Sequence, residues 1–314
     1  MGISLLGRSL LTLFDYSAAE IQHLLQLSRT VKGQCRENQL YQRFRGKTIA
    51  LLFEKRSTRT RCAFETAFGE EGGYPVFLST QDIHLGVKED LKDTARVLGR
   101  MFDAIQFRGF KQETAETLAK YSGVPVYNGL TDSYHPTQAL ADIMTLEENF
   151  GETEGRTICY IGDCRNNVAV SLMIASVKLG IHITLCAPGE LKPDEAFTAK
   201  CRNIAEETGS RIKITDKPET ALPGADAVYT DVWASMGEED KLKERKELLA
   251  PYQVDEEKMS MTGNMNTIFL HCLPAVKGNE VVESVIEGPA SRVWDQAENR
   301  KHTIKAVMLA TLIK

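Results

Sequence analysis

Residues 47–61 read KTIALLFEKRSTRTR. The first half is a short apolar run rich in strand-forming residues, and apolar residues at helical spacing follow from Cys62 to Phe68. This pattern predicts a strand, a tight turn and a helix. We expect Ser57 or Thr58 at the helix N-cap, where a side-chain hydroxyl can accept a hydrogen bond from a backbone N–H group that has no partner inside the helix.

The predicted turn has the chemistry of an anion site. The first N–H groups of a helix attract anions because they lie at the positive end of the helix dipole. Hydroxyl groups and the guanidinium groups of Arg56, Arg59 and Arg61 surround this helix start, and guanidinium groups bind phosphate oxygens well. The alternative is a capped helix with a solvated basic end. A nucleotide P-loop is excluded because its glycines and GK[ST] ending are absent.

The composition is that of a globular protein with two domains of ordinary size: 314 residues, of which 42% are hydrophobic and 26% charged. The net charge of -5 and the lack of a basic stripe argue against nucleic acid as a partner. No apolar run has membrane-spanning length. Seven irregularly spaced cysteines and an N-terminus without a signal-peptide pattern predict reduced thiols in the cytoplasm, with no disulfide framework or zinc site.

Strand-like and helix-like segments alternate in two series, separated by a polar connector from Asn149 to Gly155. Such alternation predicts parallel sheets. The expected fold class is therefore α/β, with two doubly wound parallel-sheet domains. As a separate expectation, the C-terminal helix returns to the first domain. The predicted boundaries are 1–148, 149–296 and 297–314.

Polar side chains follow several predicted strands of the first domain, where open α/β sheets form their ligand sites. Arg108 comes directly after an apolar strand, and it could bind an oxyanion or form a structural ion pair. His135 and Gln138 lie one turn apart at a helix start, where an imidazole can donate to an oxyanion and an amide can bind a carbonyl or amide group. Each residue alone is more often structural, but with residues 57–60 they form one coherent anion site.

The second domain offers a different set of groups. Asn166 and Asn167 begin a helix, where they could bind a carboxylate or cap the helix. Asp231 follows a strand and could hold an ammonium group, and the turn at 235–237 offers a hydroxyl and free N–H donors. No basic residue lies between Asp231 and the end of this turn, so the set suits a zwitterionic amino acid with a cationic side chain. Cys272 could be a structural thiol or a contact at the reacting centre.

The chain resembles the ornithine carbamoyltransferases over essentially its whole length. The matching motifs are STRTR at 57–61, DTARVL at 93–98, FRG at 107–109, HPTQ at 135–138, GDCRNN at 162–167, DVWASMGE at 231–238, HCLP at 271–274 and AENRK at 297–301. The first and fourth are shared with aspartate carbamoyltransferases, whereas the SMG turn and HCLP are more specific to the ornithine enzymes.

The resemblance implies a carbamoyl phosphate-binding first domain, an ornithine-binding second domain and a homotrimer, with no cofactor and no metal. The implied carbamoyl phosphate ligands are Ser57, Thr58, Arg59, Thr60, Arg108, His135, Gln138, Cys272, Leu273 and Arg300. The implied ornithine ligands are Asn167, Asp231, Ser235 and Met236. The implied catalytic residues are Arg108, His135 and Cys272.

The implied reaction belongs to arginine metabolism and is a direct acyl transfer. The neutral δ-amine of ornithine attacks the carbamoyl carbon, a tetrahedral oxyanion forms, and phosphate leaves with citrulline as the other product. Either Cys272 or the leaving phosphate could accept the proton. The charged segment from Glu238 to Glu247 is expected to close over ornithine, and the loop from Gln81 to Lys88 to reach a neighbouring subunit. The alternative substrate is another amine such as putrescine, which has no carboxylate for the SMG turn to bind.

Overall fold

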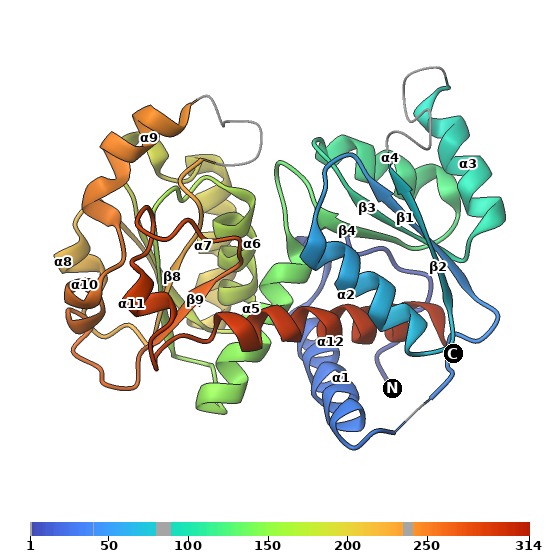
Figure 1. Cartoon of the computed structure of the whole chain (residues 1–314), viewed down its shortest axis with the longest axis horizontal. Coiled ribbons are helices and arrows are strands. Elements are labelled where there is room, and N and C mark those ends of the chain that lie inside the picture. Colours follow the sequence, from blue (N-terminus) through green and yellow to red (C-terminus); the bar gives the residue numbers. More distant parts are fainter. Residues whose placement is uncertain (1, 40, 80–88, 235–240) are drawn as a thin grey trace. The chain divides into compact units, whose positions relative to one another are not determined.

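The computed structural model describes residues 2–39, 41–79, 89–234 and 241–314. The chain divides into two compact units, one formed by residues 1–144 with 298–314 and the other by residues 145–297. Each unit holds one parallel sheet flanked by helices, which confirms the predicted α/β class (Figure 1). Two helices, α5 (Pro136–Phe150) and α12 (Val293–Leu312), run from one unit into the other.

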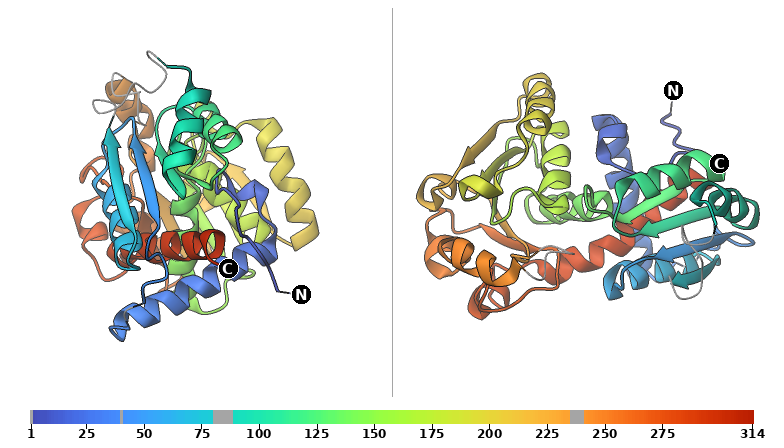
Figure 2. Two further views of the ribbon diagram at one scale, coloured as in Figure 1. Left: turned by 90° about the vertical axis from the view of Figure 1, so that its right-hand side faces the viewer. Right: turned by 90° about the horizontal axis from the view of Figure 1, so that it is seen from above.

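The first unit has a four-stranded sheet with the order β2-β1-β3-β4. The strands are β1 (Thr48–Phe53), β2 (Tyr74–Ser79), β3 (Ala104–Arg108) and β4 (Val126–Leu130). The helices that belong wholly to this unit are α1 (Ala18–Arg36), α2 (Thr58–Gly69), α3 (Leu91–Met101) and α4 (Gln112–Ser122). Both chain termini lie in this unit (Figure 2).

Alternate residues of these strands face different helices. Leu52 and Phe107 point to the side of the sheet that α3 and α4 cover, where they join one buried apolar cluster. On the opposite side, Phe64 of α2 stacks on Tyr127 of β4 with 6.2 Å between ring centroids. Because side chains alternate along a strand, Arg108 emerges on the α2 side of the sheet, one position beyond Phe107.

The second unit has a five-stranded sheet with the order β7-β6-β5-β8-β9. The strands are β5 (Thr157–Ile161), β6 (His182–Cys186), β7 (Ile212–Thr215), β8 (Ala227–Thr230) and β9 (Ile268–His271). The helices are α6 (Asn167–Lys178), α7 (Glu195–Thr208), α8 (Pro218–Ala221), α9 (Leu242–Leu249), α10 (Glu256–Ser260) and α11 (Glu283–Ile286). The polar residues that the sequence analysis singled out in this unit follow strands β5, β8 and β9.

Helix α1 begins after Ser17, which forms a reciprocal capping box with Glu20, and it continues to Arg36. The last helix was predicted from Ala297 and starts four residues earlier. The short helices α10 and α11 were not predicted, because four or five residues are too few to show a periodic pattern. Among the described residues, no helix combines the length and the apolar character needed to cross a bilayer.

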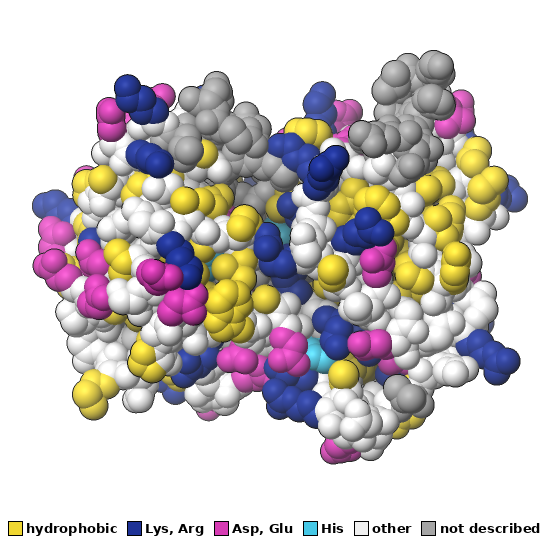
Figure 3. Space-filling model, viewed as in Figure 1, with side chains coloured by type: hydrophobic (Ala, Val, Ile, Leu, Met, Phe, Trp, Pro, Cys, Tyr) yellow, Lys and Arg dark blue, Asp and Glu magenta, His cyan; other side chains and the backbone are white. Residues whose placement is uncertain are grey.

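Strand β2 is an edge strand, and its hydrophobic side chains are only partly covered. Tyr74 is 69% exposed and the rest of the strand is half-buried. The guanidinium group of Arg61 lies 3.7 Å above the ring centroid of Phe77. Figure 3 shows hydrophobic side chains gathered on this side of the first unit. Partly covered edge strands of this kind are typical of surfaces that contact another chain.

Candidate active site

The polar groups of the first unit gather at the start of α2, where the sequence predicted an anion site. Ser57 is the N-cap, and its Oγ accepts a hydrogen bond from the N–H group of Thr60 at 3.2 Å. The buried Thr60 Oγ1 accepts from Arg108 Nη1 at 3.1 Å and from Arg300 Nη2 at 3.2 Å. Two guanidinium groups, one from the end of β3 and one from α12, therefore converge on one hydroxyl at a helix N-terminus.

His135 is buried directly before α5, and its Nδ1 lies 3.4 Å from Thr137 Oγ1. Burial holds the pKa of this imidazole well below its usual value, and the positive charges of Arg300, Arg108 and Arg59 lower the pKa further. A proton added to the ring would be both desolvated and repelled. The neutral imidazole can still donate one hydrogen bond to an oxyanion.

Gln138 presents a hydrogen-bond acceptor in the same unit. Its Nε2 donates to Asp142 Oδ1 at 2.9 Å, and both side chains are buried. Its Oε1 has no hydrogen-bond partner within the part of the chain that the structure describes. Asp142 therefore holds the amide with its oxygen available, which suits an N–H donor such as a carbamoyl nitrogen. Sequence reasoning missed Asp142, although its spacing of four residues from Gln138 in a helix was a usable signal.

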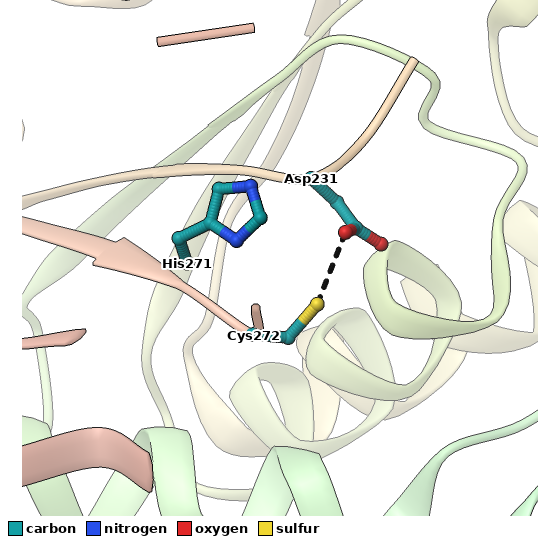
Figure 4. A group of neighbouring side chains, drawn as sticks. All are labelled: Asp231, His271 and Cys272. Carbon is teal, nitrogen blue, oxygen red and sulfur yellow. Dashed lines mark hydrogen bonds between the residues drawn. The ribbon is translucent and has the colours of Figure 1, made fainter. Parts of the chain in front are cut away.

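The second unit carries a separate group of polar side chains at the ends of β8 and β9. Cys272 Sγ donates to Asp231 Oδ1 at 3.0 Å (Figure 4). The N–H group of Val232 donates to the same oxygen at 2.8 Å. Burial raises the pKa of Asp231, although these hydrogen bonds oppose the rise. The structure thus brings together two residues that lie 41 positions apart.

The two asparagines after β5 have different positions. Asn166 is the N-cap of α6, and its Oδ1 accepts from the N–H group of Ala169 at 2.8 Å. Asn167 is the first residue of the helix and is only half-buried. Of the two roles expected for these asparagines, Asn166 therefore has that of the helix cap. Asn167 begins the first turn, and its side chain is partly accessible. Ser235 and Met236 lie outside the described residues, as do the loop predicted to reach a neighbouring subunit and the first part of the predicted lid.

A buried pair that the sequence analysis did not predict supports the turn after β9. His271 Nδ1 accepts from the N–H group of Leu273 at 2.8 Å, which places the ring proton on Nε2, and Nε2 lies 3.3 Å from Glu280 Oε1. The same Glu280 oxygen accepts from the N–H group of Val276 at 2.5 Å. Both side chains are fully buried. Leu273 has a φ of 58°, a region that costs energy for a residue with a side chain, and the pair holds the backbone in this conformation.

We expect Glu280→Ala to lower the free energy of unfolding by about 2–4 kcal/mol, because the buried His271 and the N–H group of Val276 would lose their acceptor. Chemical denaturation monitored by circular dichroism measures this change. The control is Glu283→Ala, whose side chain is 73% exposed and paired with Lys277, and which should change stability by less than about 0.5 kcal/mol. Equal effects of the two substitutions would contradict the assigned role of Glu280.

Asp231, His271 and Cys272 are also a group whose ligand atoms could hold a metal ion, since these atoms lie within 4.8 Å of one another (Figure 4). Their hydrogen bonds account for the arrangement without an ion. Cys272 Sγ donates to the carboxylate, and His271 is directed to Leu273 and Glu280. We assign no metal-dependent step to them.

Comparison with known proteins now identifies the family. Residues 8–148 match the family model described as the carbamoyl-P binding domain of aspartate/ornithine carbamoyltransferase, and residues 154–311 match the model of its Asp/Orn binding domain. The chain belongs to the aspartate/ornithine carbamoyltransferase family. Within this family, an ornithine carbamoyltransferase of Thermotoga maritima is 64% identical to this chain over 100% of both sequences.

Further relatives agree with this assignment. A catabolic ornithine carbamoyltransferase of Bacillus licheniformis is 50% identical over 99% of this chain and 98% of its own. Among solved structures, the ornithine carbamoyltransferase of Pyrococcus furiosus superposes with a TM-score of 0.95 at 43% identity and covers 99% of each chain. The resemblance inferred from the motifs is therefore confirmed over the whole chain.

Proposed function

We propose that this protein transfers the carbamoyl group of carbamoyl phosphate to the δ-amino group of L-ornithine, giving L-citrulline and phosphate. The observation that carries the proposal is the convergence of Arg108 and Arg300 on Thr60 at the start of α2. Phosphate groups bind at helix N-termini and to guanidinium groups, and here both are present in one buried place. The relatives named above supply ornithine as the acceptor.

The first unit is proposed to bind carbamoyl phosphate. Residues 57–60 would hold the phosphate with hydroxyl and N–H donors and the Arg59 guanidinium, and Arg300 would add a further positive charge. Arg108 and His135 would stabilise the oxyanion that forms at the carbamoyl oxygen, because both are preorganised donors in a buried setting. Gln138 would accept from the carbamoyl nitrogen through its available Oε1, and the carbonyl groups of Cys272 and Leu273 are proposed as further acceptors.

The second unit is proposed to bind ornithine. Asn167, Asp231, Ser235 and Met236 would hold the α-amino and α-carboxylate groups, and Cys272 would lie beside the δ-amine. The amine must be neutral to attack, and its ordinary pKa is close to that of lysine, about 10.4. The rate should therefore rise with pH through the neutral range. Either Cys272 or the leaving phosphate would take the proton that the amine loses.

The lowered pKa of His135 predicts a specific pH dependence. The imidazole stays neutral well below pH 6.5, so kcat/KM for carbamoyl phosphate should show no transition near about pH 6.5 that belongs to this residue. His135→Gln keeps a donor that does not titrate. We expect it to lower kcat/KM by about a hundredfold without changing the shape of the pH profile between about pH 5.5 and 8. The prediction would be contradicted if the wild type showed a transition near about pH 6.5 and this transition were absent from His135→Gln.

The same shift has a consequence for stability. Below about pH 6.5 the unfolded chain binds a proton at His135 that the folded protein does not bind, so the free energy of unfolding should decrease as pH falls from that value. Urea unfolding of the wild type and His135→Gln at pH 5.5 and pH 7.5 measures this. The decrease on acidification should be smaller in the variant.

We also propose that the protein forms a homotrimer in the cytoplasm. The partly covered edge strand β2 supports contact with another chain. All seven cysteines are free, which favours a reducing compartment. Light scattering on the purified protein measures the mass, and a monomer of 35.0 kDa would contradict the proposed assembly.

The experiment that tests the function offers ornithine, putrescine and aspartate in parallel with carbamoyl phosphate and measures the carbamoylated product of each. Citrulline formation with ornithine as the strongly preferred amine supports the proposal. Preference for putrescine would contradict the assignment of the α-carboxylate and α-amino contacts while leaving the phosphate half intact. Absence of transfer to every amine would overturn the proposed function.

A further inference from the structure

The mechanism above does not use Tyr160, although this residue is hydrogen-bonded to Asn166, which in turn lies beside Asp231. Tyr160 is fully buried in β5, and its ring stacks on that of Tyr229 with 5.4 Å between centroids. Its hydroxyl accepts a hydrogen bond from Asn166 Nδ2 at 2.8 Å. A buried hydroxyl with a short bond to a buried amide is an interaction that fixes the orientation of the amide.

Asn166 connects this hydroxyl to the carboxylate of Asp231. The amide oxygen is occupied by the N–H group of Ala169, so the NH₂ group must point away from the helix. One hydrogen of the NH₂ group is directed to Tyr160, and Nδ2 lies 3.5 Å from Asp231 Oδ2. Because an amide has two N–H donors, Asn166 can serve the phenol and the carboxylate together.

The two oxygens of Asp231 are thus held from different sides. Oδ1 accepts from Cys272 Sγ and from the N–H group of Val232, while Oδ2 faces Asn166. We propose that Tyr160 is a positioning residue for ornithine: through Asn166, its hydroxyl holds the Asp231 carboxylate in the orientation that receives the cationic group of the substrate. This inference rests on the proposed role of Asp231 in binding ornithine.

The test is Tyr160→Phe, which keeps the buried ring and its stacking on Tyr229 but removes the acceptor for Asn166. We expect KM for ornithine to rise about tenfold with a smaller fall in kcat, because one buried hydrogen bond that orients the binding group is lost. KM for carbamoyl phosphate should stay within about twofold, since the Thr60 site is untouched. The matched control is Tyr252→Phe in the same unit, whose hydroxyl donates to the carbonyl of Asp216 at 2.8 Å; it should change neither KM.

A second variant shows whether Tyr160 acts through Asn166. Asn166→Ser keeps an N-cap oxygen but removes the amide donors. If the chain of contacts is as proposed, adding Tyr160→Phe to Asn166→Ser should raise KM for ornithine by less than about twofold beyond Asn166→Ser alone, because the two effects are not independent. If the rises in KM for ornithine of the two single variants multiply fully in the double variant, Tyr160 does not act through Asn166 and the inference is overturned.

Other outcomes also decide the question. An unchanged KM for ornithine in Tyr160→Phe, or an equal rise in the KM of both substrates, would overturn the inference. If Tyr160→Phe does not fold, as judged by its circular dichroism, Asn166→Ser is measured alone, and an unchanged KM for ornithine in that variant overturns it. These results differ from a failure of the proposed function, in which the wild-type protein itself would not carbamoylate ornithine.

Discussion

Arg108→Leu should lower kcat/KM for carbamoyl phosphate by about 10²–10³-fold, which is typical for loss of a preorganised donor at a developing oxyanion. Arg108 emerges at the end of β3, and its Nη1 donates to Thr60 Oγ1 at 3.1 Å. Strand pairing places it level with Phe53, the last residue of β1, just before the turn that leads into α2. Leucine fills a similar volume near the sheet but supplies no charge and no donor, so the effect reports the guanidinium group.

Steady-state kinetics with carbamoyl phosphate varied at saturating ornithine measure this effect. The matched control is Arg96→Leu, which removes an exposed guanidinium group of α3 that pairs with Asp93. This control should change kcat/KM by less than about twofold, because exposed ion pairs contribute little and a long-range charge is screened by salt. A loss in Arg108→Leu of less than about tenfold would exclude Arg108 from the stabilisation of the oxyanion.

Asp231→Asn should nearly abolish the use of ornithine, with kcat/KM for ornithine lowered by about 10²–10³-fold. The substitution keeps the size of the side chain but removes the negative charge that is proposed to face a cationic group. It also puts an NH₂ group into a place where Cys272, Val232 and Asn166 all direct donors at the carboxylate. At least one of these buried donors would then face the NH₂ group of the new asparagine, which is itself a donor, and this pairing is unfavourable.

Binding of carbamoyl phosphate separates this effect from misfolding. Calorimetric titration of Asp231→Asn with carbamoyl phosphate should give a Kd within about threefold of the wild-type value, because the contacts around Thr60 lie in the other unit. The control Asp194→Asn changes the N-cap of α7. Asparagine also caps helices well, so this variant should keep wild-type kinetics. Retained use of ornithine by Asp231→Asn would remove Asp231 from the proposed site.

Local sequence patterns were sufficient to predict the elements that carry the site. The apolar run up to Phe53 and the hydroxyl-rich turn after it predicted β1, a cap at Ser57 or Thr58, and α2, because period, strand propensity and capping chemistry are all local properties. The positions of Arg108 and Asp231 at strand ends followed from the same reasoning. The motifs also identified the family, since each lies within a few consecutive residues.

The tertiary structure decided which side chains meet. The family resemblance implied that Thr60 and Arg300 bind one ligand, but only the folded chain shows that Arg300 donates to Thr60 across 240 positions and that Cys272 donates to Asp231. The buried supporting residue Glu280 was not predicted, because a polar residue that is buried has the same local pattern as one that is exposed. The sequence determined the elements and the chemistry available at their ends; packing of the sheets and helices alone decided which donors face which acceptors, because hydrogen bonds depend on distances between atoms that the chain brings together only when it folds.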